Sequence, residues 1–277
     1  MNQGPSPDAR VDLHVHTTCS DGAYTPAQVV ELARRAGLPA LAITDHDTFA
    51  GLEEARAAAA DRVELVAGVE ITCEWHDREF HLLAYFFRPG DDDLRAALER
   101  VRRRRVERFH EMIGQLRQHG VHLEDGAVAR ALLGGVIGRR QLAELLLEGG
   151  QVSTYRQAFT RYLGGDGIAI PSVSLPVAEA IALVRGAGGV AAMAHPAYDC
   201  TQEGLAQLKC HGLAAVEVDY PGFRPGRVRR LREWAAALGL AVTGGSDCHG
   251  PGDHLREVGA RGITWSELQK LRQLTCI

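Results

Sequence analysis

The sequence predicts an α/β fold: a closed or nearly closed barrel of seven strands, with helices between most of them. Short apolar runs typical of strands recur between segments of helical periodicity. Imidazole and carboxylate side chains gather where these runs end, as at the mouth of a (β/α) barrel. A doubly wound dinucleotide-binding sheet is disfavoured, because G-x-G-x-x-G follows none of the strand-like runs.

The first elements show a β-α-β pattern. A strand is expected at residues 11–15, a helix after it and a second strand at 40–44. The helix has a clear start, because Thr25 can cap it together with Gln28, and Gly37 follows its end. Five more strands are expected at residues 64–69, 80–87, 190–193, 214–218 and 241–243.

Residues 91–168 interrupt this pattern, because their apolar spacing is helical throughout. We therefore expect a barrel formed by residues 1–90 and 169–277, with an inserted helical subdomain that covers its mouth and selects the substrate. Further helices of the insertion are expected at residues 139–147 and 153–163. The basic block Arg102 to Arg105 is interpreted as a solvated helix face.

Composition excludes several classes of protein. Hydrophobic residues make up 45% of the 277 residues, which is too many for a disordered chain. Lys and Arg number 31 against 35 Asp and Glu, so no overall basic field favours DNA or a membrane surface. The N-terminal residues lack the features of a secretory signal, and we expect a cytoplasmic protein without membrane or DNA partners.

The side chains that could carry chemistry stand at the expected strand ends. His14 and His16 are two residues apart and therefore point to the same side of the first strand. His81 falls near the start of its apolar run, and reaches the centre if that strand pairs back as a hairpin after Glu70. The full set is His14, His16, Asp21, His46, Glu70, His81, His195, Asp247 and His249.

These nine groups predict a metal centre. Burying several of them without partners would cost several kcal/mol each, and metal ions would remove that cost. Nitrogen and oxygen ligands without thiolate favour Mn²⁺, Fe²⁺ or Zn²⁺. Nine protein ligands are too many for one ion, so we expect two or three divalent transition-metal ions.

Six motifs resemble those of the PHP (polymerase and histidinol phosphatase) family. They are D-L-H-V-H-T-T-C-S-D-G, I-T-D-H-D, G-V-E, H-L-L-A-Y, M-A-H-P and G-S-D-C-H, in this order between residues 12 and 249. The resemblance implies a distorted seven-stranded (β/α) barrel with a trinuclear site. It assigns one ion to His14, His16, Glu70 and Asp247, a second to Glu70, His81 and His195, and a third to Asp21, His46 and His249.

Residues 137–164 resemble the helical insertion of the family's subgroup that contains nucleoside 3′,5′-bisphosphate phosphatase and 5′-3′ exoribonuclease. The chain departs from that subgroup at Arg139-Arg140-Gln141, where Arg-Pro-His is usual, and in the lack of a basic residue in Gly164 to Gly167. Arg139 follows glycines near a helix start and is the candidate contact for a substrate phosphate, with Arg140 as the alternative. Asp45 and Glu217 are candidates for supporting positions around the metal ligands.

The resemblance implies a metal-dependent phosphoesterase. It would hydrolyse phosphomonoesters of small nucleotides, a nucleoside 3′,5′-bisphosphate or a nucleoside monophosphate, with a hydroxide bridging two ions as nucleophile. Three alternatives stay open: histidinol phosphate phosphatase, a 5′-3′ exoribonuclease acting on short RNA, and a noncatalytic PHP module. A serine hydrolase is disfavoured, because Ser246 lacks the surrounding G-x-S-x-G pattern.

Overall fold

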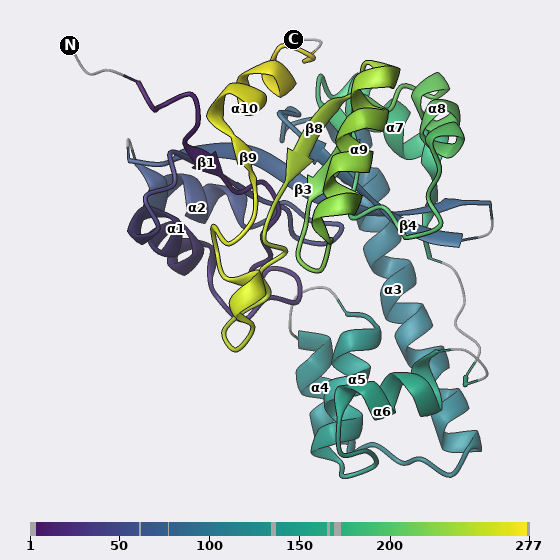
Figure 1. Cartoon of the computed structure of the whole chain (residues 1–277). Coiled ribbons are helices and arrows are strands. Elements are labelled where there is room, and N and C mark those ends of the chain that lie inside the picture. The colour runs from purple at the N-terminus through teal and green to yellow at the C-terminus, as the bar shows by residue number, and fades with distance from the viewer. Residues whose placement is uncertain are drawn as a thin grey trace.

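The computed structural model describes residues 4–60, 62–76, 78–133, 137–164, 167–168 and 173–275. Most of its strands form one curled sheet (Figure 1). The sheet has the order β2 (Ala40–Ile43), β3 (Glu64–Trp75), β4 (Arg78–Tyr85), β6 (Val190–Met193), β7 (Ala215–Asp219) and β8 (Ala241–Gly244), with β5 (Leu175–Pro176) beside β3. Neighbouring strands are parallel except that β4 is antiparallel to β3 and β6. The predicted α/β barrel class is confirmed.

Residues 12–16 bridge the two ends of this sheet. Asp12 accepts a hydrogen bond from Ala42 of β2, and on the other side the amide of Leu13 donates to Gly244 of β8 at 3.1 Å. The first strand, predicted at residues 11–15, is regular only over β1 (Arg10–Val11), which pairs with β9 (Ile263–Thr264). The reason is local: the amides of His14 and Val15 donate to side chains, those of Asp12 and Thr44, instead of to a neighbouring strand.

One glycine allows residues 12–16 to lie against the end of β8. A Cβ atom on Gly245 would stand 2.3 Å from the backbone nitrogen of His14 and 2.7 Å from Oδ1 of Asp12. Only glycine leaves room for that approach. The position of His14 therefore depends on the absence of a side chain at residue 245.

Helices cover the outside of the sheet (Figure 1). They are α1 (Pro26–Arg35), α2 (Leu52–Ala59), α7 (Val177–Gly186), α8 (Gln202–Cys210), α9 (Pro225–Leu238) and α10 (Trp265–Arg272), with a short 3₁₀ turn, η2 (His254–Arg256). The predicted capping box is present at α1, where the Thr25 side chain accepts from the amide of Gln28. Apolar faces of α7, α8 and α9 pack on the sheet and form the largest core cluster.

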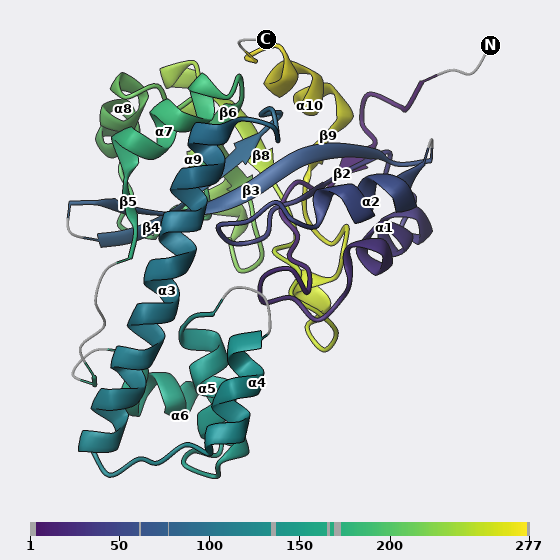
Figure 2. The same ribbon diagram turned by 180° about the vertical axis from the view of Figure 1, so that it is seen from behind.

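Between residues 92 and 163, all regular elements of the described chain are helical, as predicted. They are α3 (Asp92–Gln118), α4 (Asp125–Leu133), α5 (Arg139–Glu148), α6 (Tyr155–Ala158) and a π-helical turn, η1 (Phe159–Leu163). Figure 2 shows α3 running from the sheet to α4–α6. Leu94 and Val101 of α3 pack in the barrel core, whereas Phe109 and Met112 pack in a separate helical core. The assignment of residues 91–168 as a substrate-covering subdomain stays a prediction.

The basic block Arg102 to Arg105 was interpreted as a solvated helix face, and this is wrong for Arg105. Arg105 is buried, and its Nε donates to Oδ2 of Asp47 at 2.7 Å. Arg102 is exposed and pairs with Glu99 of its own helix. The helical period explains the split, because Arg105 follows Val101 by four residues and shares its buried side.

In the described part of the chain, no helix is both long enough and apolar enough to cross a membrane.

Candidate metal centre

The carboxylate of Glu70 lies at the centre of the predicted site. Its Oε1 is 2.9 Å from Nδ1 of His81 and 3.0 Å from Nε2 of His195. Its Oε2 is 3.1 Å from Nε2 of His16, 3.2 Å from Nδ1 of His46 and 3.3 Å from Nε2 of His14. The two oxygens therefore face two different groups of imidazoles.

The strands bring Glu70 to this place differently from the expectation. Glu70 was expected to end its strand, but β3 continues to Trp75 and pairs with β4 as a hairpin. The segment that follows β2 (Ala40–Ile43) reaches Glu70 instead, through an isolated parallel bridge from His46. The hairpin also places His81 opposite Thr72, so the conditional expectation for His81 is confirmed.

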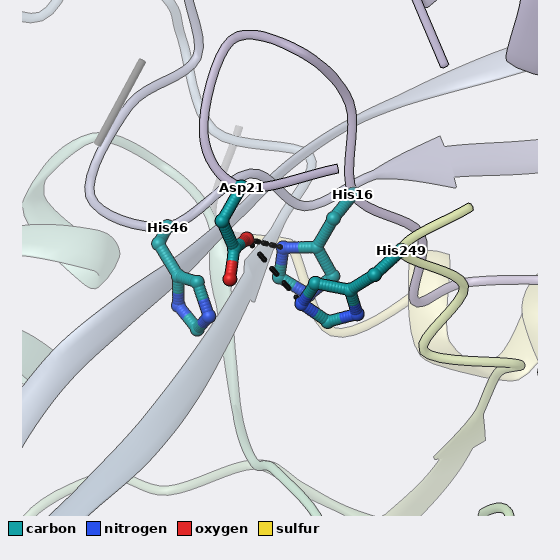
Figure 3. Close-up of side chains that lie close together, drawn as sticks. All are labelled: His16, Asp21, His46 and His249. Carbon is teal, nitrogen blue, oxygen red and sulfur yellow. Dashed lines mark ion pairs between the residues drawn. The ribbon is translucent and has the colours of Figure 1, made fainter. Parts of the chain in front are cut away.

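A second group forms around Asp21. Figure 3 shows His16, Asp21, His46 and His249 with their side chains gathered together. Oδ1 of Asp21 is 3.3 Å from Nε2 of His249 and 3.7 Å from Nδ1 of His16. One ligand atom from each of these four residues lies within 4.8 Å of the others, a spacing that suits a shared cation.

Asp247 joins the two groups. Its Oδ1 is 3.2 Å from Nε2 of His16, 3.4 Å from Nδ1 of His249 and 3.5 Å from Nε2 of His14. Its other oxygen, Oδ2, accepts from Tyr220 at 2.8 Å and forms an ion pair with Arg256. Asp247 has a left-handed backbone, with φ of 49°, which is costly for a residue other than glycine and is typical of functional sites.

Glu217 and Asp45, the two carboxylates of uncertain role, both make buried contacts next to the candidate ligands. Glu217 is fully buried; its Oε1 is 3.0 Å from Nδ1 of His14, and its Oε2 accepts from the backbone amide of His195. Asp45 contacts none of the imidazoles in this way, and instead accepts from both the amide and the hydroxyl of Thr17 and from the hydroxyl of Ser20. Asp45 thereby fixes the loop that leads to Asp21.

The donor set fits metal ions. Both ring nitrogens of His16 and Nδ1 of His46 are buried and have no hydrogen-bond partner among the described residues. They nevertheless lie within 3.1–3.7 Å of carboxylate oxygens of Glu70, Asp21 and Asp247. These nitrogens and carboxylate oxygens approach one another without forming hydrogen bonds. Ligands of a common cation have the same arrangement.

The charges of the site also favour cations. Burial by itself would raise the pKa of Glu70, but His46, His81 and His14 hold that pKa well below its ordinary value. The pKa of Asp247 is likewise lowered, chiefly by His14 and His16 against the effect of burial. Both carboxylates are therefore ionised at neutral pH, which is the form that binds metal.

Two cavities open beside these residues. One of about 480 Å³ reaches from Asp21 and His249 to Arg140 and Glu148 of α5. The other, of about 510 Å³, is lined by Asp247, His249, Arg140 and Arg256, among others. The helical segment therefore borders the space above the candidate metal ligands.

Arg139 and Arg140, although adjacent, lie in different surroundings. Arg139 donates to Oε1 of Glu79 at 3.0 Å, on the strand that carries His81. Glu79 also pairs with the buried Arg108, so two guanidinium groups share one carboxylate. The assignment of Arg139 as a phosphate contact stays a prediction. Gly134, Gly135, Gly165 and Asp166, which entered the sequence argument, lie outside the described residues.

Sequence reasoning missed three supporting groups: Tyr220, Arg256 and the Arg105–Asp47 pair. Tyr220 directly follows β7, the strand that carries Glu217, so its place at a strand end was a usable signal. Arg256 lies in the 3₁₀ turn η2, nine residues after Asp247, and no local pattern connects the two. Contacts of this kind are set by tertiary structure.

Comparisons with known proteins found related sequences and structures. The sequence profile of the PHP domain family matches residues 12–163. A 3′,5′-nucleoside bisphosphate phosphatase from Chromobacterium violaceum is 33% identical over 91% of each chain. A 5′-3′ exoribonuclease from Haemophilus influenzae is 34% identical, over 87% of this chain and 90% of the relative. A solved structure from Bifidobacterium adolescentis, described as a candidate metal-dependent phosphoesterase, has a TM-score of 0.85 and 33% identity, over 97% of this chain and 96% of that one.

Proposed function

The chain belongs to the PHP domain family, and we propose that it is a metal-dependent phosphoesterase that hydrolyses phosphomonoesters of small nucleotides. Its substrate would be a nucleoside 3′,5′-bisphosphate or a nucleoside monophosphate. The relative from Chromobacterium violaceum, named for its action on 3′,5′-nucleoside bisphosphates, supports this choice.

One observation carries the proposal: the two oxygens of Glu70 face two separate sets of imidazoles. A carboxylate placed in this way can bridge two ions. We propose that Glu70 does so, with His14, His16 and Asp247 on one side and His81 and His195 on the other. Asp21, His46 and His249 would hold a third ion, and Mn²⁺, Fe²⁺ and Zn²⁺ suit such donors.

The ions, when bound, supply a nucleophile from water at neutral pH and neutralise charge on the phosphoryl oxygens. The chain's own groups position the ligands. Glu217 holds the ring of His14 through Nδ1, which leaves Nε2 directed at Glu70. Tyr220 and Arg256 occupy Oδ2 of Asp247 and leave Oδ1 facing the imidazoles. The same supporting contacts are typical of functional metal sites.

Arg139 would contribute on the side of His81. It shares Glu79 with Arg108, and this group of two cations and one anion keeps a net positive charge. A substrate phosphate can therefore take one of the donors without leaving Glu79 unpaired. Arg139→Gln should then lower kcat/KM for nucleotides more than for an aryl phosphate.

A panel of phosphorylated metabolites, assayed with the purified protein and added Mn²⁺, tests the function. We expect release of inorganic phosphate from nucleotides and loss of activity after removal of metal by a chelator. Preference for histidinol phosphate over every nucleotide would reassign the substrate. No hydrolysis of any phosphomonoester by protein shown to hold metal would contradict the proposal.

A second candidate is removal of nucleotides from the 5′ end of short RNA, which the named activity of the relative from Haemophilus influenzae favours. The chemistry is close, and the two cavities lie side by side, because Arg140 and His249 line both of them. Short 5′-phosphorylated RNA distinguishes the candidates, because an exoribonuclease releases mononucleotides from it whereas a phosphatase releases phosphate.

A further inference from the structure

We propose that Arg140 and Arg256 form a subsite for a second phosphate of the substrate, the one that is not hydrolysed. This proposal rests on the proposed function and adds specificity-determining residues to it. The subsite lies next to the candidate metal ligands, on the side of His249 and Asp247. It is separate from Arg139, which pairs with Glu79 beside His81.

The shared cavity is the first argument. Arg140, from α5 of the helical segment, and Arg256, from the turn η2 of the barrel, line the same space of about 510 Å³. His249 and Asp247 line it as well, so the two guanidinium groups stand beside the groups that would bind the reacting phosphate. A ligand in this space would contact both parts of the chain.

Arg140 has donors to spare. Its nearest carboxylate, Oε1 of Glu144, is 3.7 Å from its Nε, which is beyond hydrogen-bond distance. That Nε is buried and has no hydrogen-bond partner among the described residues. A buried guanidinium nitrogen without a partner is costly, and an anion in the cavity would satisfy it.

Arg256 is held in place beside the cavity. It pairs with Oδ2 of Asp247, donates to the hydroxyl of Tyr220 at 3.0 Å, and its guanidinium lies 5.2 Å from the centre of that ring. Its side chain is 31% exposed, so part of the guanidinium remains open to a ligand. A fixed cation loses little conformational entropy when it binds an anion.

The charge balance of the cavity favours an anion once metal is bound. Three carboxylates oppose the two arginines: Asp247, Asp253, whose Oδ2 is 3.6 Å from Nε of Arg256, and Glu144, whose Oε1 is 3.7 Å from Nε of Arg140. Asp247 directs Oδ1 at the imidazoles, so a cation held there would offset its charge. Two or three divalent ions at the candidate ligands would bring an excess of positive charge, and guanidinium groups bind phosphate oxygens in pairs.

Steady-state kinetics of the metal-loaded protein tests the subsite. Adenosine 3′,5′-bisphosphate is compared with adenosine 5′-monophosphate and p-nitrophenyl phosphate for wild type, Arg140→Gln and Arg256→Lys. Losing one charge-assisted contact should lower kcat/KM for the bisphosphate by about 10- to 150-fold in Arg140→Gln and change it least for p-nitrophenyl phosphate. Arg104→Gln, at an exposed position of α3, is the matched control and should leave all three rates unchanged.

Arg256 also contacts Asp247, so its loss could act through the metal ligands. Arg256→Lys keeps the charge, and metal content measured on each variant separates the two effects. A selective loss on the bisphosphate with unchanged metal content supports the subsite. Equal losses on all three substrates in Arg140→Gln, again with unchanged metal content, would overturn it, as would an unchanged preference for the bisphosphate.

Equilibrium binding keeps this test independent of catalysis. Calorimetry with non-hydrolysable phosphonate analogues of adenosine 3′,5′-bisphosphate and adenosine 5′-monophosphate should show tighter binding of the bisphosphate analogue by wild type, and loss of that difference in Arg140→Gln. If wild type binds the analogues in this way but hydrolyses neither parent nucleotide, the proposed function fails and the subsite stands. If wild type and Arg140→Gln discriminate equally between the two compounds, the subsite fails.

Discussion

The guanidinium of Arg105 and the carboxylate of Asp47 form a buried ion pair, with 2.7 Å between Nε and Oδ2. Asp47 follows His46 directly and also accepts from the amide and hydroxyl of Thr72, two residues after Glu70. The pair thus joins helix α3 to the segment after β2 and to β3, which carry His46 and Glu70. It ties the helical segment to the metal centre.

Breaking this pair should destabilise the protein. Arg105→Met leaves the carboxylate of Asp47 buried without its cation, a change that costs about 3–5 kcal/mol. Arg102→Met on the same helix removes only an exposed pair with Glu99 and should change the free energy of unfolding by less than about 0.5 kcal/mol. Urea denaturation of the two variants and wild type measures the difference. Equal stability of both variants would show that the pair contributes nothing.

Wild-type protein reconstituted with Mn²⁺ should hold two or three equivalents of metal per chain. Glu70→Gln should lower this number and abolish most activity, because the substitution removes the charge that faces two sets of imidazoles. Glu111→Gln, on the exposed side of α3, is the control. Elemental analysis decides, and one equivalent or less in wild type would refute the multinuclear assignment.

Glu217→Gln should weaken metal binding without removing a ligand. The glutamine cannot provide the charged acceptor that Glu217 offers to Nδ1 of His14, and loss of such supporting contacts typically lowers metal affinity about 10- to 100-fold. Competition with a chelator of known affinity measures the change, with the exposed Glu233→Gln as control. Unchanged affinity in Glu217→Gln would mean that the charge of Glu217 is not needed to orient His14.

Gly245→Ala should destabilise the protein and reduce its metal content, because the added Cβ would collide with the backbone of His14. Gly114→Ala is the opposite case: it lies within α3 with no atom near its added Cβ, and should stabilise the protein by about 0.4–1 kcal/mol. Thermal unfolding of both variants shows the sign of each change. A stable, metal-replete Gly245→Ala protein would contradict the close approach.

The set of candidate ligands could be predicted because it follows from local rules. Two-residue periodicity puts His14 and His16 on one face, and parallel strands bring their ends to one mouth. The hairpin that delivers His81 could be stated only as a condition, because register between strands is not visible in either strand alone.

The contacts of individual arginines could not be predicted. Arg105 belongs to a run of four arginines, and only packing decides which of them is buried. Arg140 and Arg139 are neighbours with different partners, since successive residues of a helix point in different directions. A sequence pattern predicts the period of a helix or strand. It does not predict which polar side chains tertiary packing turns towards the core.

Residues 12–16 close the sheet by contacting both β2 and β8. Strand β8 comes more than 200 positions later in the chain. During synthesis, His14 and His16 therefore leave the ribosome long before Asp247 and His249 exist. Contacts across such separations form slowly, because a large loop must be closed first. Metal loading of the complete candidate centre would then wait until His249 has been translated, because before that point the chain lacks the last of its candidate ligands.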